Sequence, residues 1–163
     1  TEDLLLLARL EGHAEKMQQV NMGLLLEEIF EDLSPLHPLL KKKIPQQKLK
    51  IQGNPDSLYR VLLNLLDNAF KSDTQAEVLL SCWRQEQEVL VQVQDQGPGI
   101  PAVHLPHLFE RFYRIDSDRN RNSGGSGIGL ALVAEVIKLH HGSIQVHSQE
   151  GQGTSFLLRF PLV

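Results

Sequence analysis

The sequence predicts an α/β fold, a two-layer sandwich with a mixed sheet, and three observations support this prediction. Residues 57–71 place apolar side chains at i, i+3, i+4, i+7, i+8 and i+11, which is one face of an α-helix. β-rich runs at 76–83 and 89–94 flank a polar stretch and predict a hairpin, and runs at 143–148 and 154–161 predict two closing strands. The 163 residues suffice for one domain of about 150 residues plus an appendage. Because helices and hairpins alternate irregularly, a doubly wound parallel sheet fits less well.

The first third of the chain has a weaker pattern. Apolar spacing at 3–10 predicts the end of a helix, and a polar linker follows it. A second helix is predicted at about 23–43, kinked or divided by Pro35 and Pro38 and ending in Lys41-Lys42-Lys43. Lys48–Ile51 alternates like a short strand, and a helix from about Gly127 to His140 is expected later. We therefore expect a helical lead-in at 1–44 and a compact domain at 45–163.

Composition narrows the class of protein. The net charge of −4 disfavours nucleic acid as a partner. The single Cys82 cannot form an internal disulfide, and no apolar run approaches the roughly 18 residues of a membrane span. The chain starts inside a helical pattern and lacks a signal sequence, so we expect a fragment of a longer protein, in a reducing, cytoplasmic environment.

Nine of the twelve glycines fall at or after position 97. Gly125-Ser126-Gly127-Ile128-Gly129 opens the helix predicted from Gly127, where backbone N–H groups suit an anion, although a plain flexible loop is the alternative. A Rossmann site is disfavoured because no strand precedes these glycines, and a P-loop because no Lys-Ser or Lys-Thr follows them. Asp116, Asp118 and Asn120 resemble the start of a calcium loop that lacks its turn glycine and its final Glu.

Two further groups of residues suit a nucleotide. Asp95-Gln96-Gly97-Pro98-Gly99 follows a strand, so Asp95 could accept a hydrogen bond from an exocyclic amine, or simply start a turn. Asn64, Asn68 and Lys71 form one stripe opposite the apolar face of the 57–71 helix. Amide oxygens suit Mg²⁺ and a lysine suits phosphates, although a solvated helix face is the alternative.

Taken in order, these motifs resemble the ATP-binding domain of two-component sensor histidine kinases, a branch of the Bergerat-fold family. The resemblance spans about residues 45–162. Residues 64–71 resemble the N box, 95–100 the G1 box, 108–114 the F box and 125–130 the G2 box, and a Gly-Thr strand closes the series. The fold it implies is a Bergerat sandwich with a long ATP lid at 102–124. Phe109 and Phe112 are expected to anchor this lid.

The resemblance implies a role for each matching residue. Asp95 would recognise the adenine amino group, with close approach at Gly97 and Gly99 and an apolar slot from Ile100 and Leu130. Asn68 would ligate Mg²⁺ beside Asn64, while Lys71 and Arg114 would contact the phosphates of ATP. The remaining nucleotide contacts would come from Gly125, Gly127, Ile128, Gly129 and Thr154. Ser72 departs from the family pattern, in which Tyr is commoner, and this loss of an aromatic residue implies modest affinity.

The resemblance also implies the reaction. Bergerat-fold ATPases resemble one another in carrying a water-activating Glu at the place that corresponds to position 64 of this chain. This chain has Asn64 there, and an amide cannot act as a base. We therefore expect transfer of the γ-phosphate to a histidine, because a neutral imidazole is already nucleophilic near pH 7. The alternatives are an ATP-hydrolysing relative and a degenerate nucleotide-binding or protein-docking module.

Partners follow from the same resemblance. Residues 4–11 are similar to the end of the second helix of a dimerisation and phosphoacceptor domain, and the chain has no phosphoacceptor box. His13 and His37 are expected to be bystanders, and the other histidines to lie at the surface or at helix ends without metal spacing. We expect a monomeric fragment of a homodimeric protein, with an upstream acceptor domain and a response regulator receiver domain as partners.

Overall fold

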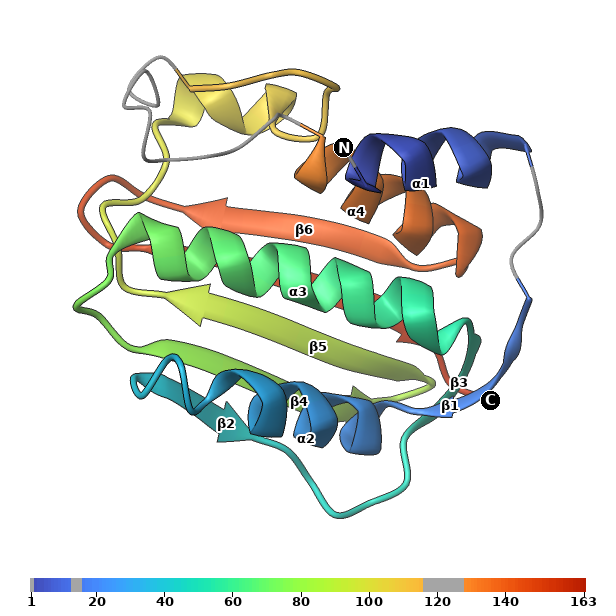
Figure 1. The fold of residues 1–163 in the computed structure, drawn as a ribbon. Helices are drawn as coiled ribbons and strands as arrows, with labels where there is room; N and C mark the ends of the chain where they lie inside the picture. Colours follow the sequence, from blue (N-terminus) through green and yellow to red (C-terminus); the bar gives the residue numbers. More distant parts are fainter. Residues whose placement is uncertain (1, 13–15, 116–127) are drawn as a thin grey trace.

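The computed structural model describes residues 2–12, 16–115 and 128–163. The elements in chain order are α1 (Glu2–Gly12), β1 (Gln18–Asn21), α2 (Met22–Leu33), β2 (Leu40–Lys43), β3 (Lys50–Gly53), α3 (Pro55–Ser72), β4 (Val78–Gln85), β5 (Glu88–Asp95), the 3₁₀ helix η1 (Ala102–His107), α4 (Gly129–Leu139), β6 (Ser143–Ser148) and β7 (Thr154–Pro161). Figure 1 shows α2 and α3 lying across one face of the sheet.

The described strands form a five-stranded sheet in the order β2-β4-β5-β7-β6 and a two-stranded sheet of β1 and β3. β2 runs parallel to β4, whereas the other neighbours in the large sheet are antiparallel. The sheet is therefore mixed, and both predicted hairpins are present. This architecture confirms the two-layer α/β fold that the sequence predicts.

Helix α3 forms where its periodicity predicts, with two extra residues before and one after. The side-chain oxygen of Asn54 accepts a hydrogen bond from Ser57 N–H at 2.9 Å, and Pro55 occupies the first turn, where a missing N–H costs nothing. The apolar stripe is 0–3% exposed at Leu58, Val61, Leu62, Leu65, Leu66 and Ala69. Burial of this stripe against the sheet directs the opposite stripe, with Asn64 and Asn68, away from the core.

The helix predicted at 23–43 is wrong in its second half. Helix α2 ends at Leu33, and two turns containing Pro35 and Pro38 lead into β2, so Lys41-Lys42-Lys43 is an edge strand rather than a helical turn. The prolines remove backbone N–H groups that a helix needs, and Leu40 is 3% exposed in the core opposite Val78. Exposed lysines on an edge strand also oppose pairing with another chain.

The core begins well before residue 45. Strand β1, which the sequence pattern missed, pairs with β3, and Met22, Leu26 and Ile29 of α2 are 0% exposed in the same core cluster as α3. The expected boundary between 1–44 and 45–163 therefore passes through packed elements. Only α1 lies before them, and it contacts α4 through the buried Leu7, while Asp3 accepts from Arg60 Nε at 2.8 Å.

Of the expected lid, the structure describes residues 102–115. The ring of Phe109 meets Phe156 edge-on, with centroids 6.4 Å apart, and this contact ties the segment to the sheet. Phe112 is 65% exposed and has a positive φ of 65°, so its expected role as a second anchor is wrong. The residues Gly125 and Gly127, together with 116–124 and 126, lie outside the described residues.

Candidate functional site

Asp95 lies at the end of β5 and is 7% exposed. Its Oδ1 accepts a hydrogen bond from Gly97 N–H at 2.9 Å, and it is also hydrogen-bonded by the Ser72 hydroxyl and the Thr154 N–H. Burial raises the pKa of the Asp95 carboxyl, and these three hydrogen bonds oppose that shift. These hydrogen bonds hold the Asp95 carboxylate where β5, β7 and the end of α3 meet.

Ser72 belongs to this network, although sequence reasoning noted only the aromatic residue that it replaces. Its hydroxyl lies 2.8 Å from Ala69 O and also bonds the Asp95 carboxylate, so its single proton is shared between two acceptors. A Cβ at Gly97 would lie 2.6 Å from Ser72 Oγ, which shows how closely the loop after β5 packs against α3. No local pattern in the sequence predicts this contact.

A second hydroxyl, at Ser148, fastens the loop after β5 to the β6–β7 hairpin. Ser148 Oγ accepts from Ile100 N–H at 2.7 Å and lies 2.8 Å from Thr154 Oγ1. Gly99 has a φ of 78°, and a Cβ there would lie 2.0 Å from Gln149 O. The fold itself therefore requires glycine at 99, because the hairpin backbone occupies the place where a Cβ would lie.

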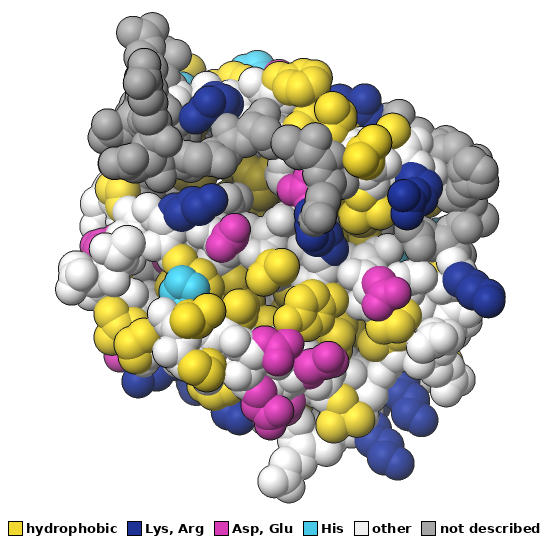
Figure 2. Space-filling model, viewed as in Figure 1, with side chains coloured by type: hydrophobic (Ala, Val, Ile, Leu, Met, Phe, Trp, Pro, Cys, Tyr) yellow, Lys and Arg dark blue, Asp and Glu magenta, His cyan; other side chains and the backbone are white. Residues whose placement is uncertain are grey.

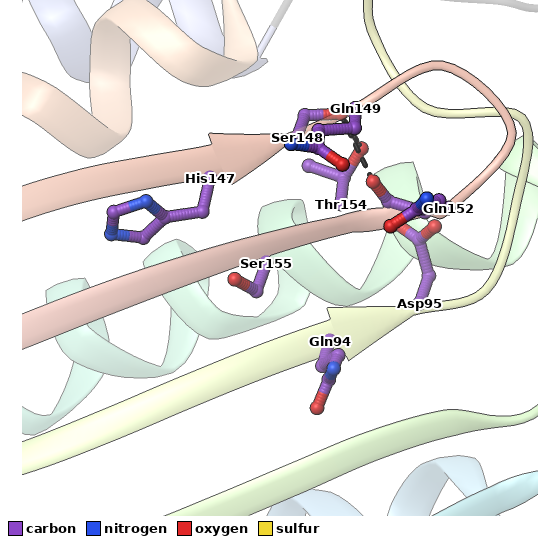
Figure 3. Close-up of a pocket in the computed structure, with 9 residues that line it drawn as sticks. Gln94, Asp95, His147, Ser148, Gln149, Gln152, Thr154 and Ser155 are labelled. Atoms are coloured by element: carbon purple, nitrogen blue, oxygen red, sulfur yellow. Dashed lines mark hydrogen bonds between the residues drawn. The ribbon is translucent and has the colours of Figure 1, made fainter.

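The same hairpin borders a pocket of about 280 Å³. Figure 3 shows Asp95 and Thr154 at the ends of their strands, beside the hairpin residues Ser148, Gln149 and Gln152. Gln94, Ser155 and His147 are paired across three neighbouring strands and complete the lining. Asp95, expected to recognise adenine, and Thr154, expected to contact the nucleotide, thus border a polar pocket, but Gln94 and Ser155 alternate with buried residues and belong to the sheet face opposite α3.

The stripe on α3 meets the start of α4. Asn64 Nδ2 donates a hydrogen bond to Gly129 O at 3.4 Å, while Asn68 lies one turn further along α3 and is exposed. Lys71 Nζ lies 3.8 Å from Asp67 Oδ2, an exposed pair that leaves its ammonium accessible. The structure therefore places Asn64 at the first turn of α4, with Asn68 one turn and Lys71 about two turns further along α3.

The N-terminus of α4 has the features of an anion site. No side chain caps the helix at Ile128, and no acidic residue occupies the first turn. A Cβ at Gly129 would have its nearest neighbours, atoms of Asn64, at 3.9 Å, which is ordinary contact. Among the described residues there is room for a methyl group at position 129, so their packing does not explain the glycine.

Other expected residues are placed as follows. Ile128 is 1% exposed in the core, Ile100 and Leu130 are partly buried, and Arg114 is exposed after η1.

Among the described residues, no group of three or more His, Cys, Asp or Glu side chains could hold a metal ion. None of the helices described is both long and apolar enough to cross a membrane.

Comparison with known proteins gives one consistent result. Residues 53–163 match the family model for histidine kinase-, DNA gyrase B- and HSP90-like ATPases. The sensor histidine kinase RppB of Synechocystis is 35% identical, and the phosphate regulon sensor protein PhoR of Pseudomonas aeruginosa is 37% identical. The matches cover 98% and 97% of this chain and 37% of each relative. The chain thus spans little more than a third of these sensor proteins.

Solved structures agree with this match. Full-length ShkA in complex with AMPPNP superposes with a TM-score of 0.85 at 27% identity, covering 99% of this chain and 35% of ShkA. The catalytic domain of the histidine kinase ThkA has the same fold, with a TM-score of 0.74 at 20% identity, and the match covers 90% of this chain and 98% of that domain. The chain belongs to the family of histidine kinase-, DNA gyrase B- and HSP90-like ATPases, with the Bergerat ATP-binding fold of histidine kinase catalytic domains.

Proposed function

We propose that the chain is the catalytic domain of a sensor histidine kinase, which binds Mg-ATP and transfers the γ-phosphate to a histidine of an upstream helical domain. The observation that carries this proposal is the stripe of Asn64, Asn68 and Lys71 along α3, with Asn64 hydrogen-bonded to Gly129 O in the first turn of α4. Amide oxygens, a cation and the N-terminal end of a helix are groups that suit a triphosphate and its magnesium.

Asp95 would select the base. Ionised, its carboxylate accepts a hydrogen bond from the exocyclic amine of adenine, which guanine does not offer at that position. The hydrogen bonds from Gly97 and Ser72 hold the carboxylate in one orientation. Because the group is buried, the bond to the amine forms away from water and discriminates strongly.

The phosphates would lie between α3 and the start of α4. Asn68 would ligate Mg²⁺ through its amide oxygen, and Asn64, already bonded to Gly129 O, would support the same region. Magnesium bound there would neutralise part of the negative charge of the phosphates. Lys71 and Arg114 would contact the phosphate oxygens, and Gly125, Gly127 and Gly129 would approach them with backbone N–H groups. Ile100 and Leu130 would border the base, with Ile128 and Thr154 behind them.

Transfer rather than hydrolysis follows from Asn64. An amide cannot remove a proton from water, so this position supplies no general base for hydrolysis. The unprotonated nitrogen of a neutral imidazole attacks the γ-phosphorus without one, the bond from the γ-phosphorus to the β-phosphate oxygen breaks, ADP leaves, and the proton on the other ring nitrogen passes to water. The domain's contribution is positioning and charge neutralisation.

The acceptor would lie outside this chain. We propose that α1 is the end of the second helix of a dimerisation and phosphoacceptor domain, and that the whole protein is a homodimer that serves a response regulator receiver domain. The contact of Leu7 and Asp3 with the ATP-binding domain supports continuity between the two. His37, expected to be a bystander, stacks on Phe70 with ring centroids 3.7 Å apart, which supports a packing role.

Calorimetry with ATP, with and without magnesium, tests the binding proposal. We expect heat with Mg-ATP, weaker binding after chelation, and loss of this magnesium effect in Asn68→Ala. Gln75→Ala, an exposed polar change in the loop after α3, is the control. Absence of binding, or binding that Asp95→Asn leaves unaltered, would assign the chain to protein docking instead.

Radiolabelled phosphate tests the reaction. This chain alone should incorporate none from γ-labelled ATP, whereas the full-length protein should form an acid-labile, alkali-stable phosphohistidine. Label in this chain that His13→Ala abolishes would contradict the proposal. Substantial ATP turnover by the chain, lost in Asn64→Ala, would favour a hydrolase.

A further inference from the structure

Helix α2 carries four carboxylates, at Glu27, Glu28, Glu31 and Asp32, and no basic residue. Glu27 forms an ion pair with Lys42. Asp32 accepts a hydrogen bond from the Tyr59 hydroxyl at 2.6 Å, which is a neutral donor and leaves the charge in place. Figure 2 shows acidic side chains gathered over α2. Three carboxylates of this helix thus lack a cation of their own among the described ion pairs.

This arrangement opposes the stability of α2 itself. Glu31 and Asp32 occupy the last turn, where the helix dipole favours cations, and α2 itself carries no basic residue there. Glu28 repels Glu31 at i+3 and Asp32 at i+4. Local rules broken in this way are expected at surfaces kept for function.

Exposed leucines border the acids. Leu24, one turn before Glu28, is 68% exposed, and Leu36, one turn after Asp32, is 77% exposed. The chain continues in helical turns to this point, because Ser34 N–H bonds Phe30 O and His37 N–H bonds Leu33 O. Figure 2 shows hydrophobic side chains spreading beside the acids, between α2 and α3. We define the α2 surface as Leu24, Glu28, Glu31, Asp32 and Leu36.

We propose that the α2 surface binds an amphipathic helix of a partner that carries Lys or Arg side chains beside an apolar face. Apolar side chains of such a helix would cover the leucines, and its cations would pair with the three carboxylates and with the C-terminal dipole of α2. A second copy of this chain would bring the same acids, and an anionic membrane would be repelled, so charge favours a basic partner over both.

The surface is separate from the ATP site. On α3, Tyr59 contacts Asp32 of α2, whereas Asn64 contacts the start of α4 on another side of the helix. Changes on the α2 surface should therefore leave nucleotide binding intact, which distinguishes this proposal from the proposed kinase function.

The first test titrates the chain into a fluorescent peptide of about 18 residues, or five helical turns, with leucines on one face and lysines on the other. We expect saturable binding that weakens as salt rises. A peptide of the same composition without an apolar face, and one with Glu in place of Lys, should bind far more weakly. Equal binding of the reordered peptide would show charge attraction alone and overturn the proposal.

The second test uses Glu28→Gln with Glu31→Gln. This pair should weaken peptide binding about tenfold, raise the unfolding temperature by relieving repulsion, and leave Mg-ATP binding unchanged. Glu77→Gln with Glu150→Gln makes the same change in net charge at exposed sites elsewhere and is the matched control. An equal loss of binding in both pairs would overturn the proposal.

Leu24→Ser separates packing from charge, because it should weaken the peptide complex without altering net charge. Sedimentation of the chain alone provides the last outcome. Self-association that Leu24→Ser removes would assign the surface to a second copy and contradict a basic partner.

Discussion

Nε2 of His140 accepts a hydrogen bond from the backbone N–H of Asn54 at 3.0 Å and so joins the end of α4 to the start of α3. Nδ1 of His140 lies 2.7 Å from Val136 O, and a carbonyl oxygen can only accept, so Nδ1 carries the proton. Because Nε2 accepts, the imidazole is neutral. The ring is 3% exposed and lies edge-on to Phe160. Because Asn54 caps α3, His140 fixes the first turn of the helix that carries Asn64 and Asn68.

His140→Ala should cost about 2–4 kcal/mol of unfolding free energy, since it leaves a buried N–H without its acceptor and opens a cavity. Urea unfolding measures this loss. The exposed His147→Ala is the control and should change stability by less than about 0.5 kcal/mol. Equal effects of the two substitutions would contradict the bridging role of His140.

Gly129→Ala should fold normally and bind Mg-ATP at least about tenfold more weakly, a loss of about 1.4 kcal/mol. The described residues leave room for this methyl group. The methyl group would, however, obstruct a phosphate bound at the helix terminus. Gly99→Ala should instead destabilise the chain by about 2 kcal/mol or more, because its Cβ would overlap Gln149 O at a positive φ. Thermal unfolding and calorimetry separate the two effects, and full ATP affinity in Gly129→Ala would remove this helix terminus from the site.

Asp95→Asn should abolish selective ATP binding while leaving the unfolding temperature unchanged or higher. Burial raises the pKa of Asp95, so its ionised form is held at a cost that a neutral amide avoids. Calorimetry and thermal unfolding of the same samples test this opposition. A large fall in unfolding temperature would mean that the carboxylate is primarily structural.

ATP affinity should fall on acidification through the pKa of Asp95, at a higher pH than an ordinary aspartate would give, because only the ionised carboxylate accepts from the adenine amine. The contribution of Asp95 to folding stability depends on pH in the opposite direction. A carboxyl with a raised folded-state pKa contributes stability that is fully present below its unfolded pKa and is lost as pH rises through its folded pKa. Calorimetry across acidic to neutral pH measures the first effect. The weaker, unselective binding that remains in Asp95→Asn should lack this pH dependence, and an unchanged profile for that binding would assign the titration to another group.

Phe109→Ala should lower the unfolding free energy by about 2–4 kcal/mol, because the ring packs on Phe156. Phe112→Ala should change it by less than about 0.5 kcal/mol, since that ring is 65% exposed. Both are followed by urea unfolding. Similar losses would mean that Phe112 also anchors the segment.

Local patterns in the sequence predicted the elements with strong periodicity. The apolar stripe of 57–71, the two hairpins and the helix before His140 all appear in the structure, because each depends on residues within a few positions of one another. The order of the motifs around Asn64, Asp95 and Gly129 likewise identified the ATP-binding fold. The individual roles of these residues toward ATP and magnesium remain predictions.

Local patterns in the sequence did not predict the short strands or the buried polar contacts. Strands β1 and β2 have four residues each, and their pairing with β3 and β4 decides their conformation. The same holds for Ser72 on Asp95, Ser148 on Ile100 and His140 on Asn54, whose partners lie far away in sequence. The sequence by itself determined periodicity, turns and the chemistry of the stripe on α3. Only the tertiary structure decided which distant backbone groups each side chain satisfies, because a buried hydrogen bond depends on neighbours that only folding brings together.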